Sequence, residues 1–233
     1  IVNPKKQFSV TEWRDLSQKK ILEIIAREKT PILCGGTGFY IDALLQGVQF
    51  PEVLPNNELR KALAKETPAH LYAKLKKLDP RRASSIDRHN PHRLIRAIEI
   101  AKTLGKVPSK KKRANPYQVL WIGTDLPQAV LQANIHKRLI DRLKQGMIKE
   151  AQALHRSGLS FKRMHELGLE YRWLAIFLQK KIPRKKMIEG LERDIIHYAK
   201  RQKTWFKKNT AIQWYRPNTQ SDIKKIMKLI DTF

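Results

Sequence analysis

The sequence predicts an α/β protein, in which strands of a parallel sheet are combined with a helical insert. Three stretches of the chain lead to this prediction. Residues 31–47 read as a short apolar strand, a glycine turn and an amphipathic helix. Residues 117–123 are rich in β-branched and aromatic side chains, as strands are. Residues 51–114, between the two, have helical periodicity and are set off by prolines.

The net charge alone, without any motif, indicates which class of partner the protein binds. The 233 residues include 48 Lys and Arg against 21 Asp and Glu, a formal charge of +27. This excess is far larger than solubility requires, so we expect a polyanionic partner. The hydrophobic content of 41% is too high for a disordered basic tail, so the chain is expected to fold.

Cysteine usage and hydropathy point to a reducing compartment. Cys34 is the single cysteine of the sequence, which excludes an internal disulfide, and we expect it to be a small core residue. No apolar run approaches the roughly 20 residues of a membrane span, and the first ten residues lack the apolar centre of a signal peptide. We therefore expect a cytoplasmic protein with no membrane partner.

The first predicted helix begins near Ser9 and runs to about Glu28. Ser9 can cap the helix, and Glu12, three residues later, can return the hydrogen bond. This helix leads toward a central strand although no strand precedes it. The sequence therefore reads as one that starts in the middle of a domain.

The glycine turn that follows is the most informative feature of the sequence. Pro31 to Cys34 is too short for a helix and predicts a buried parallel strand. Gly35, Gly36 and Gly38 would let a ligand approach the main chain, and Thr37 would face the space above the strand. The alternative is a tight strand-to-helix turn with no ligand.

The helical insert is predicted to contain one helix over 58–77 and a second over 90–104. Residues 108–116, with two prolines and four consecutive basic residues, then predict an exposed connector. After the strand at 117–123, Asp125 is expected to cap a long helix that carries Arg138 and Arg142 on one face. The rest of the chain is read as helices.

Two short segments combine basic residues with a possible base-stacking group. In the first, Arg93 and Arg96 share a helical face, so both guanidinium groups could reach phosphates while His92 contacts a base. A solvated basic face is the alternative. In the second, Gly168 marks a turn before Tyr171 and Arg172, which offer a stacking face and a phosphate ligand. Here the alternative places Tyr171 in the core and Arg172 in solvent.

A third segment, residues 198–206, alternates aromatic and cationic side chains. At helical spacing Tyr198, Arg201 or Gln202, and Trp205 form one stripe. Such a stripe suits a nucleic-acid or diphosphate surface, and a simple core face is the alternative.

Four segments, occurring in order at 35–47, 78–100, 168–172 and 198–206, resemble the tRNA dimethylallyltransferases. The resemblance extends over almost the whole chain. It implies a core like that of P-loop kinases, with its N-terminal part missing here, formed by residues 1–50 and 115–233. Residues 51–114 would be a helical tRNA-binding insertion. The implied reaction transfers a dimethylallyl group from dimethylallyl diphosphate to N6 of the adenosine 3′ of the anticodon, with Mg²⁺ as cofactor.

The resemblance also implies roles for individual residues. Thr37 would be catalytic and lie beside the target adenosine, which must flip out of the anticodon loop. Lys200 and Arg201 would bind the diphosphate. The residues implied to contact the anticodon stem-loop of tRNA are Gly36, Gly38, Arg60, His92, Arg93, Leu94, Ile95, Arg96, Gly168, Tyr171 and Arg172. A monomer is the expected state, and no metal ligand is identified.

Two departures from the family pattern qualify this expectation. No GxxxxGK[ST] phosphate loop occurs in residues 1–233, and the family's general-base aspartate would also lie upstream of Ile1. Ile195 and Ile196 stand where many members have Thr-Arg. We therefore expect this chain to bind tRNA but to transfer little by itself. The alternatives are a non-catalytic RNA-binding protein and, ranked last, an isopentenyltransferase acting on free adenylate.

Overall fold

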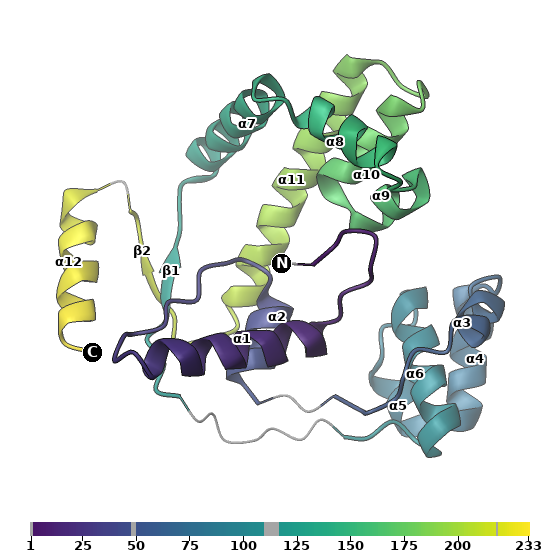
Figure 1. The fold of residues 1–233 in the computed structure, drawn as a ribbon. Helices are drawn as coiled ribbons and strands as arrows, with labels where there is room; N and C mark the ends of the chain where they lie inside the picture. The colour runs from purple at the N-terminus through teal and green to yellow at the C-terminus, as the bar shows by residue number, and fades with distance from the viewer. Residues whose placement is uncertain (1, 48–49, 110–116, 218) are drawn as a thin grey trace. The chain divides into compact units, whose positions relative to one another are not determined.

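The computed structural model describes residues 2–47, 50–109, 117–217 and 219–233. The chain forms two compact units (Figure 1). The first unit combines Ile1–Ile41 with Pro116–Phe233, and the second unit is Asp42–Asn115. The sequence had placed the helical insertion at 51–114, inside the range of the second unit.

The first unit begins with helix α1 (Val10–Ile25), whose N-terminal capping box was predicted. The Ser9 side chain accepts a hydrogen bond from the Glu12 amide, and the Glu12 carboxylate accepts one from the Ser9 amide at 2.7 Å. The helix ends before the expected Glu28, whose φ of 55° lies in the left-handed region that terminates helices. Local capping chemistry therefore sets the start of this element.

The apolar run 31–34 does not form the predicted strand. Ile32 is 88% exposed, and Cys34 is also exposed, so the expectations of a buried strand and a core cysteine are wrong. A strand needs a neighbouring strand to satisfy its backbone groups. Within the described ranges, the one sheet pairs β1 with β2 and leaves residues 31–34 without such a neighbour.

The sheet has two parallel strands, β1 (Ile122–Thr124) and β2 (Gln213–Tyr215), with Ile122 opposite Gln213. The α/β class is thus confirmed, with far less sheet than helix. The predicted strand over 117–123 is shorter than expected, since β2 offers only three residues to pair with it. β2 itself was not predicted, because the end of the chain was read as helices alone.

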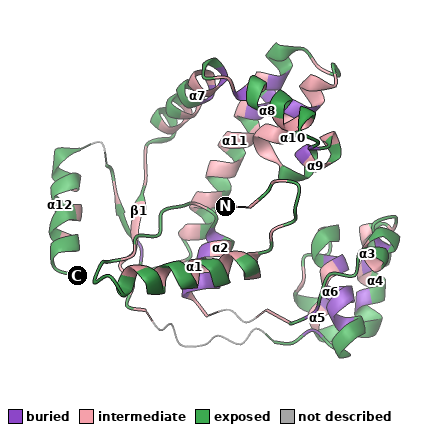
Figure 2. Cartoon of the chain, in the orientation of Figure 1, coloured by how far each residue is buried: buried purple, intermediate pink, exposed green. Residues whose placement is uncertain are grey.

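Helices α7 to α11 make the crossover between the two strands, and α12 follows β2 (Figure 1). Helices α8, α10 and α11 each contain buried positions (Figure 2). Their buried residues belong to one hydrophobic cluster, which includes Leu174, Met187 and Leu191. The helices are α7 (Gln128–Lys144), α8 (Met147–Arg156), α9 (Phe161–Leu167), α10 (Leu169–Leu178), α11 (Arg184–Phe206) and α12 (Gln220–Asp231).

Asp125 does not cap α7, contrary to the prediction. Pro127 occupies the N-cap position and no side chain caps the helix. The Asp125 carboxylate instead accepts a hydrogen bond from Lys203 Nζ of α11 at 2.6 Å. The Asp125 carboxylate therefore binds the cationic Lys203 side chain and not the backbone amides at the start of α7.

The second unit contains α3 (Asn57–Leu63), α4 (Pro68–Leu78), α5 (Pro80–Ser85) and α6 (Pro91–Leu104). The single helix predicted over 58–77 is divided into α3 and α4, because Thr67 caps a new helix with Pro68 in its first turn. The helix predicted over 90–104 is confirmed as α6, capped by Asn90. Most of the connector predicted at 108–116 lies outside the described residues.

Candidate active site

Helix α11 passes directly against the glycine turn of residues 35–38. Two of its side chains make hydrogen bonds there, at positions four residues apart. The Tyr198 hydroxyl lies 3.2 Å from Thr37 Oγ1, and Gln202 Nε2 donates to the Gly36 carbonyl at 2.9 Å. Three residues further along, the ring of Trp205 covers Gly38. The predicted stripe on α11 thus faces the turn, where α2 (Gly38–Leu45) begins.

The turn needs glycine at two positions because of this helix. A Cβ on Gly38 would lie 2.2 Å from Trp205 Cδ1, and one on Gly36 would lie 2.2 Å from Gln202 Nε2. A Cβ on Gly35 would meet nothing within 4 Å. The close approach predicted for a ligand is therefore made by α11 at Gly36 and Gly38, whereas Gly35 faces open space.

Thr37 remains exposed, and α11 carries exposed cations within one turn after Tyr198, the partner of Thr37. Lys200 and Arg201 are both exposed, and the Arg201 guanidinium lies 5.7 Å from the centre of the Tyr198 ring. This distance is in the range of a cation–π contact, which restricts the directions that Arg201 can take. The Arg201 guanidinium is thus held near the ring whose hydroxyl contacts Thr37.

Aromatic rings form the apolar border of the turn. Phe39 and Trp205 meet edge to face with ring centres 6.5 Å apart, and Trp13 and Tyr40 do so at 5.3 Å. Trp205 is 38% exposed, so the stripe on α11 is neither fully core nor fully surface. Flat rings around a hydroxyl can accept an adenine base or a prenyl chain.

The turn between α9 and α10 is built around Gly168, whose φ of 82° favours glycine. The Tyr171 hydroxyl donates to Glu150 Oε1 at 2.6 Å, and partial burial together with this bond raises the pKa of Tyr171 to about 12. Tyr171 is therefore neutral at any physiological pH. Arg172, next to it, is exposed and available to a phosphate.

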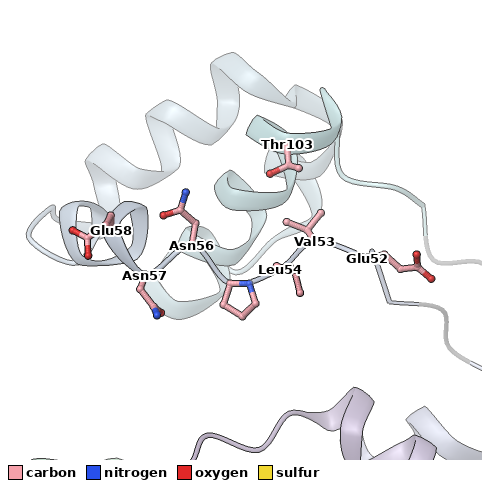
Figure 3. A pocket seen from close by; sticks show the side chains of 8 residues that line it. Glu52, Val53, Leu54, Asn56, Asn57, Glu58 and Thr103 are labelled. Carbon is pink, nitrogen blue, oxygen red and sulfur yellow. The ribbon is translucent and has the colours of Figure 1, made fainter.

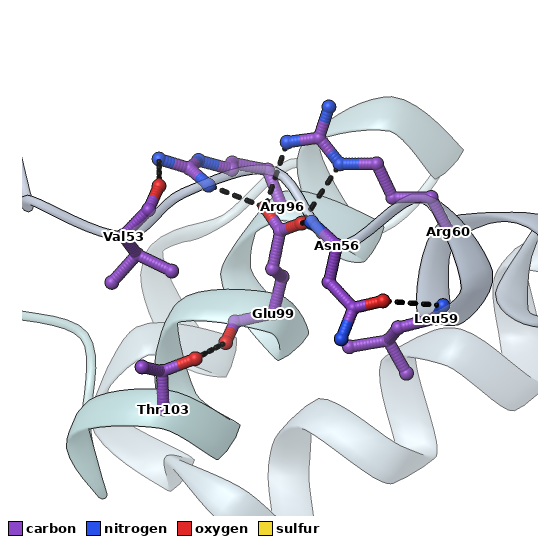
Figure 4. A network of polar contacts seen from close by, with 7 residues as sticks. All are labelled: Val53, Asn56, Leu59, Arg60, Arg96, Glu99 and Thr103. Atoms are coloured by element: carbon purple, nitrogen blue, oxygen red, sulfur yellow. Dashed lines mark hydrogen bonds and ion pairs between the residues drawn. The ribbon is translucent and has the colours of Figure 1, made fainter.

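A buried carboxylate organises the arginines of the second unit (Figure 4). Glu99 is 1% exposed and accepts hydrogen bonds from Arg60 Nε at 2.9 Å and from Arg60 Nη2 at 2.7 Å. It also accepts from the Asn56 amide at 2.7 Å and from Arg96 Nη1. Burial raises the pKa of Glu99, but the bonds from Arg60, Asn56 and Arg96 outweigh burial and leave the pKa below its ordinary value.

The five residues 92–96 fall into three groups. Leu94 and Ile95 are buried in the core of the second unit, so their side chains hold α6 in place and do not reach solvent. His92 and Arg93 are exposed. Arg96 is half-buried, and besides Glu99 it donates to the Val53 carbonyl at 3.0 Å. The pair predicted to share one role therefore consists of one exposed and one anchored arginine.

An open hollow of about 610 Å³ lies beside this network (Figure 3). Its border carries the carboxylates of Glu52 and Glu58, and no lysine or arginine is among its lining residues within the described ranges. Two carboxylates repel phosphate, so the hollow itself is not a phosphate site.

The chain is similar to proteins of one known family. A family model described as IPP transferase matches residues 1–209. The chain belongs to the IPP transferase family. It is 36% identical to a tRNA dimethylallyltransferase of Halothermothrix orenii, over 97% of this chain and 71% of that protein. A tRNA dimethylallyltransferase of Acetivibrio thermocellus is 34% identical, over 97% of this chain and 75% of that protein.

Solved structures of IPP transferases share the fold. The full-length tRNA isopentenylpyrophosphate transferase of Bacillus halodurans gives a TM-score of 0.68 at 29% identity, covering 100% of this chain and 75% of that one. The Staphylococcus epidermidis protein of the same type gives 0.67 at 26%, covering 100% and 79%. The family resemblance read from the four sequence segments is therefore confirmed.

Some residues of the candidate site were not predicted from the sequence, and for others only part of their role was predicted. Tyr198, Gln202 and Trp205 were placed on one stripe, but their contacts with the glycine turn were not predicted. Glu99 was not singled out at all. A signal for it exists in the sequence, since it is an acidic residue among the apolar positions of α6 and three residues after Arg96.

Proposed function

We propose that this IPP transferase transfers the dimethylallyl group of dimethylallyl diphosphate to N6 of the adenosine 3′ of the anticodon in tRNA. The observation that carries the proposal is the contact of the glycine turn with α11, in which the Thr37 hydroxyl meets Tyr198 and the Arg201 guanidinium lies 5.7 Å from the centre of the Tyr198 ring. The names of the relatives in H. orenii and A. thermocellus support the same reaction. They do not favour the alternative of a non-catalytic RNA-binding protein.

The chemistry is a displacement at an allylic carbon. The N6 nitrogen forms a bond to C1 of the dimethylallyl group, the C1–O bond breaks, and diphosphate leaves with the electron pair while N6 loses a proton. Negative charge grows on the leaving oxygen, so the cations Lys200 and Arg201 would stabilise the transition state more than the substrate. An exocyclic amine is a poor nucleophile, and its orientation is therefore a large part of the catalytic task.

Thr37 would supply that orientation. A threonine hydroxyl has one donor and two acceptor positions. Its contact with the Tyr198 hydroxyl at 3.2 Å uses one of them and fixes the direction of those that remain. The free positions can then bind the adenine amine. The Tyr198 bond thus makes a surface hydroxyl into a directed one.

Each unit carries cations that would contact the anticodon stem-loop of tRNA. His92, Arg93 and Arg172 are exposed, and Arg60 and Arg96 expose about a third of their side chains. Phosphate binding by such groups is strongly salt-dependent. We propose a cytoplasmic protein, in the compartment where tRNA is modified. No helix of the described residues is long and apolar enough to cross a membrane.

Mg²⁺ is proposed only as a companion of the diphosphate. The described parts of the chain contain no group of three or more His, Cys, Asp or Glu side chains that could hold a metal ion. We derive no step of the reaction through a metal.

The proposal is tested by nucleoside analysis. The protein, expressed from its own gene, is incubated with tRNA, dimethylallyl diphosphate and Mg²⁺, and the digested tRNA is analysed by mass spectrometry. We expect one adenosine, 3′ of the anticodon, to gain a dimethylallyl group. A tRNA with guanosine at that position is the matched control and should stay unmodified. RNA binding without any transfer, by protein that folds normally, would favour the non-catalytic alternative.

A further inference from the structure

The proposed reaction gives Glu99 no role, although this carboxylate has several charged and polar partners. A carboxylate 1% exposed to solvent must be compensated, and here two guanidinium groups and one backbone amide compensate it (Figure 4). Arg60 belongs to α3 and Arg96 to α6, so one carboxylate joins two helices. Asn56 and Val53 are tied to the same network, which fixes the segment between them as well.

Both arginines remain partly exposed to solvent although they bond to Glu99. The side chain of Arg60 is 34% exposed and that of Arg96 is 36% exposed, whereas Glu99 is buried. Arg60 uses Nε and Nη2 toward Glu99, and its Nη1 makes no hydrogen bond within the described ranges. Arg60 thus keeps Nη1 for a ligand, whereas Arg96 donates from Nη1 to Glu99 and from Nη2 to the Val53 carbonyl and stays partly exposed. A planar fork held along one edge has a fixed direction for its other donors.

A purely structural role is the simpler account of such a network, yet it explains the observations less well. Buried ion pairs add little stability compared with apolar side chains of similar size, because the charges must be taken out of water. What they do provide is defined geometry. Here the defined groups are half-exposed arginines, in a chain with a net charge of +27.

We propose that Glu99 is a positioning residue for RNA, which holds Arg60 and Arg96 as one preformed phosphate clamp. This inference rests on the proposed function, since it takes the anticodon stem-loop of tRNA as the ligand. Glu99 does not touch the RNA. It acts through the two arginines, whose side chains would otherwise lose rotamer freedom on binding.

Because Glu99 is charged, electrostatics alone and loss of positioning predict opposite changes in RNA affinity when it is replaced. Removing a negative charge from an RNA-binding surface raises its positive potential, so electrostatics alone predicts tighter binding. Loss of positioning predicts weaker binding. The substitution Glu99→Gln, which keeps the size of the side chain, therefore separates the two accounts by the direction of the change.

The experiment measures binding of a tRNA anticodon stem-loop RNA to the full chain at fixed salt. For Glu99→Gln we expect the dissociation constant to rise about tenfold, as for the loss of a charge-assisted hydrogen bond. Glu58→Gln is the matched control, because Glu58 lies in the same unit, is exposed, and pairs only with Lys61 at 3.0 Å among the described residues. It changes the net charge equally and should bind as well as the wild type or slightly better. Unchanged or tighter binding by Glu99→Gln overturns the proposal.

A second pair of variants decides the matter if Glu99→Gln does not fold, as judged by its thermal unfolding. Arg60→Lys and Arg96→Lys retain every charge but lose the planar fork. We expect each to weaken RNA binding severalfold with an unaltered salt slope, and wild-type affinity in both would overturn the proposal. The proposed function fails separately, if the wild-type chain itself does not bind the stem-loop.

Discussion

The Glu99 network of the second unit and the Thr37 turn of the first unit both fix a candidate binding group by hydrogen bonds, but in opposite environments. Glu99 is buried and ionised, and it accepts bonds from two guanidinium groups. Thr37 is exposed and neutral, and its hydroxyl lies 3.2 Å from that of Tyr198. One arrangement is part of the core, whereas the other lies at the surface.

The difference teaches how closely binding and stability are linked in each unit. A buried charge that loses its partners is severely unfavourable, so a change at Glu99 must affect the fold as well as the arginines. An exposed hydroxyl that loses its partner can bond to water instead, at little cost. The second unit therefore couples its candidate binding groups to its stability, and the turn of the first unit does not.

Glu99→Ala should have the largest effect on the free energy of unfolding. It leaves Arg60 and Arg96 facing a cavity without a counter-charge, and we expect a loss of about 3 kcal/mol, the lower end for a broken buried pair, because both arginines are partly exposed. Urea unfolding followed by circular dichroism measures it. Glu58→Ala, at the exposed pair with Lys61, should stay within about 0.5 kcal/mol of the wild type. Equal effects in the two variants would remove the distinction between the units.

Low pH should also lower the stability of the second unit. The pKa of Glu99 is lowered in the folded state by its partners, so its contribution to stability is present above about pH 4.5 and is lost as the pH falls through the folded-state pKa. Asp79, which accepts hydrogen bonds from the Arg82 and Val107 amides, also has a lowered pKa and adds to this dependence. We expect stability to fall below pH 4.5, and less steeply in Glu99→Ala.

In the protein expressed from its own gene, Thr37→Ala should lower the rate of dimethylallyl transfer about a hundredfold, the usual cost of removing one directed hydrogen-bonding group from a reacting centre. The free energy of unfolding should change by less than about 0.5 kcal/mol, because Thr37 is exposed. Single-turnover kinetics and urea unfolding are measured on the same preparations. Tyr198→Phe, which removes only the partner hydroxyl, should fall between the two. A stability loss that accounts for the whole rate loss would show Thr37 to be structural.

Gly38→Ala should destabilise the first unit by about 1–3 kcal/mol, the usual cost of overpacking. Its new Cβ would lie 2.2 Å from Trp205 Cδ1, so the ring that covers the turn must move. Gly35→Ala is the matched control, since a Cβ there meets nothing within 4 Å, and should unfold at nearly the wild-type temperature. Trp205 fluorescence should shift in Gly38→Ala alone. Two variants that unfold alike would mean that α11 does not restrict the turn.

Sequence patterns succeeded where the deciding contacts are local. The capping box at Ser9 and the start of α6 after Asn90 were predicted because each depends on residues three positions apart. The strand at 31–34 failed because a strand depends on its neighbour, which periodicity does not show. The break at Thr67 was missed although Thr-Pro is a helix start, since the apolar spacing continues across it.

The same difference between local and distant contacts applies to the residues of the candidate site. The stripe on α11 was predicted from its own spacing, whereas its contact with Thr37 joins residues 161 positions apart and appears only in the folded chain. Likewise Arg93 and Arg96 look equivalent in sequence because both are arginines on one helix. The structure separates them because Arg96 donates to the Val53 carbonyl, 43 positions away, and shares Glu99 with Arg60 of another helix. Chemistry carried by partners distant in sequence is what the patterns could not supply.

That separation leads to the smallest expected effect, in Arg93→Ala. Arg93 is exposed, and no hydrogen bond of its side chain occurs within the described ranges, so we expect no change in the free energy of unfolding. If it holds one tRNA phosphate, the slope of log affinity against log salt should become shallower by about 0.7 to 0.9. Arg96→Ala should lose a similar slope but also stability, because it removes a partner of Glu99. Stem-loop binding over a salt series, with urea unfolding in parallel, gives both quantities. An unaltered slope in Arg93→Ala would make it an ordinary solvated arginine, and the phosphate contacts of the second unit would then rest on the anchored pair alone.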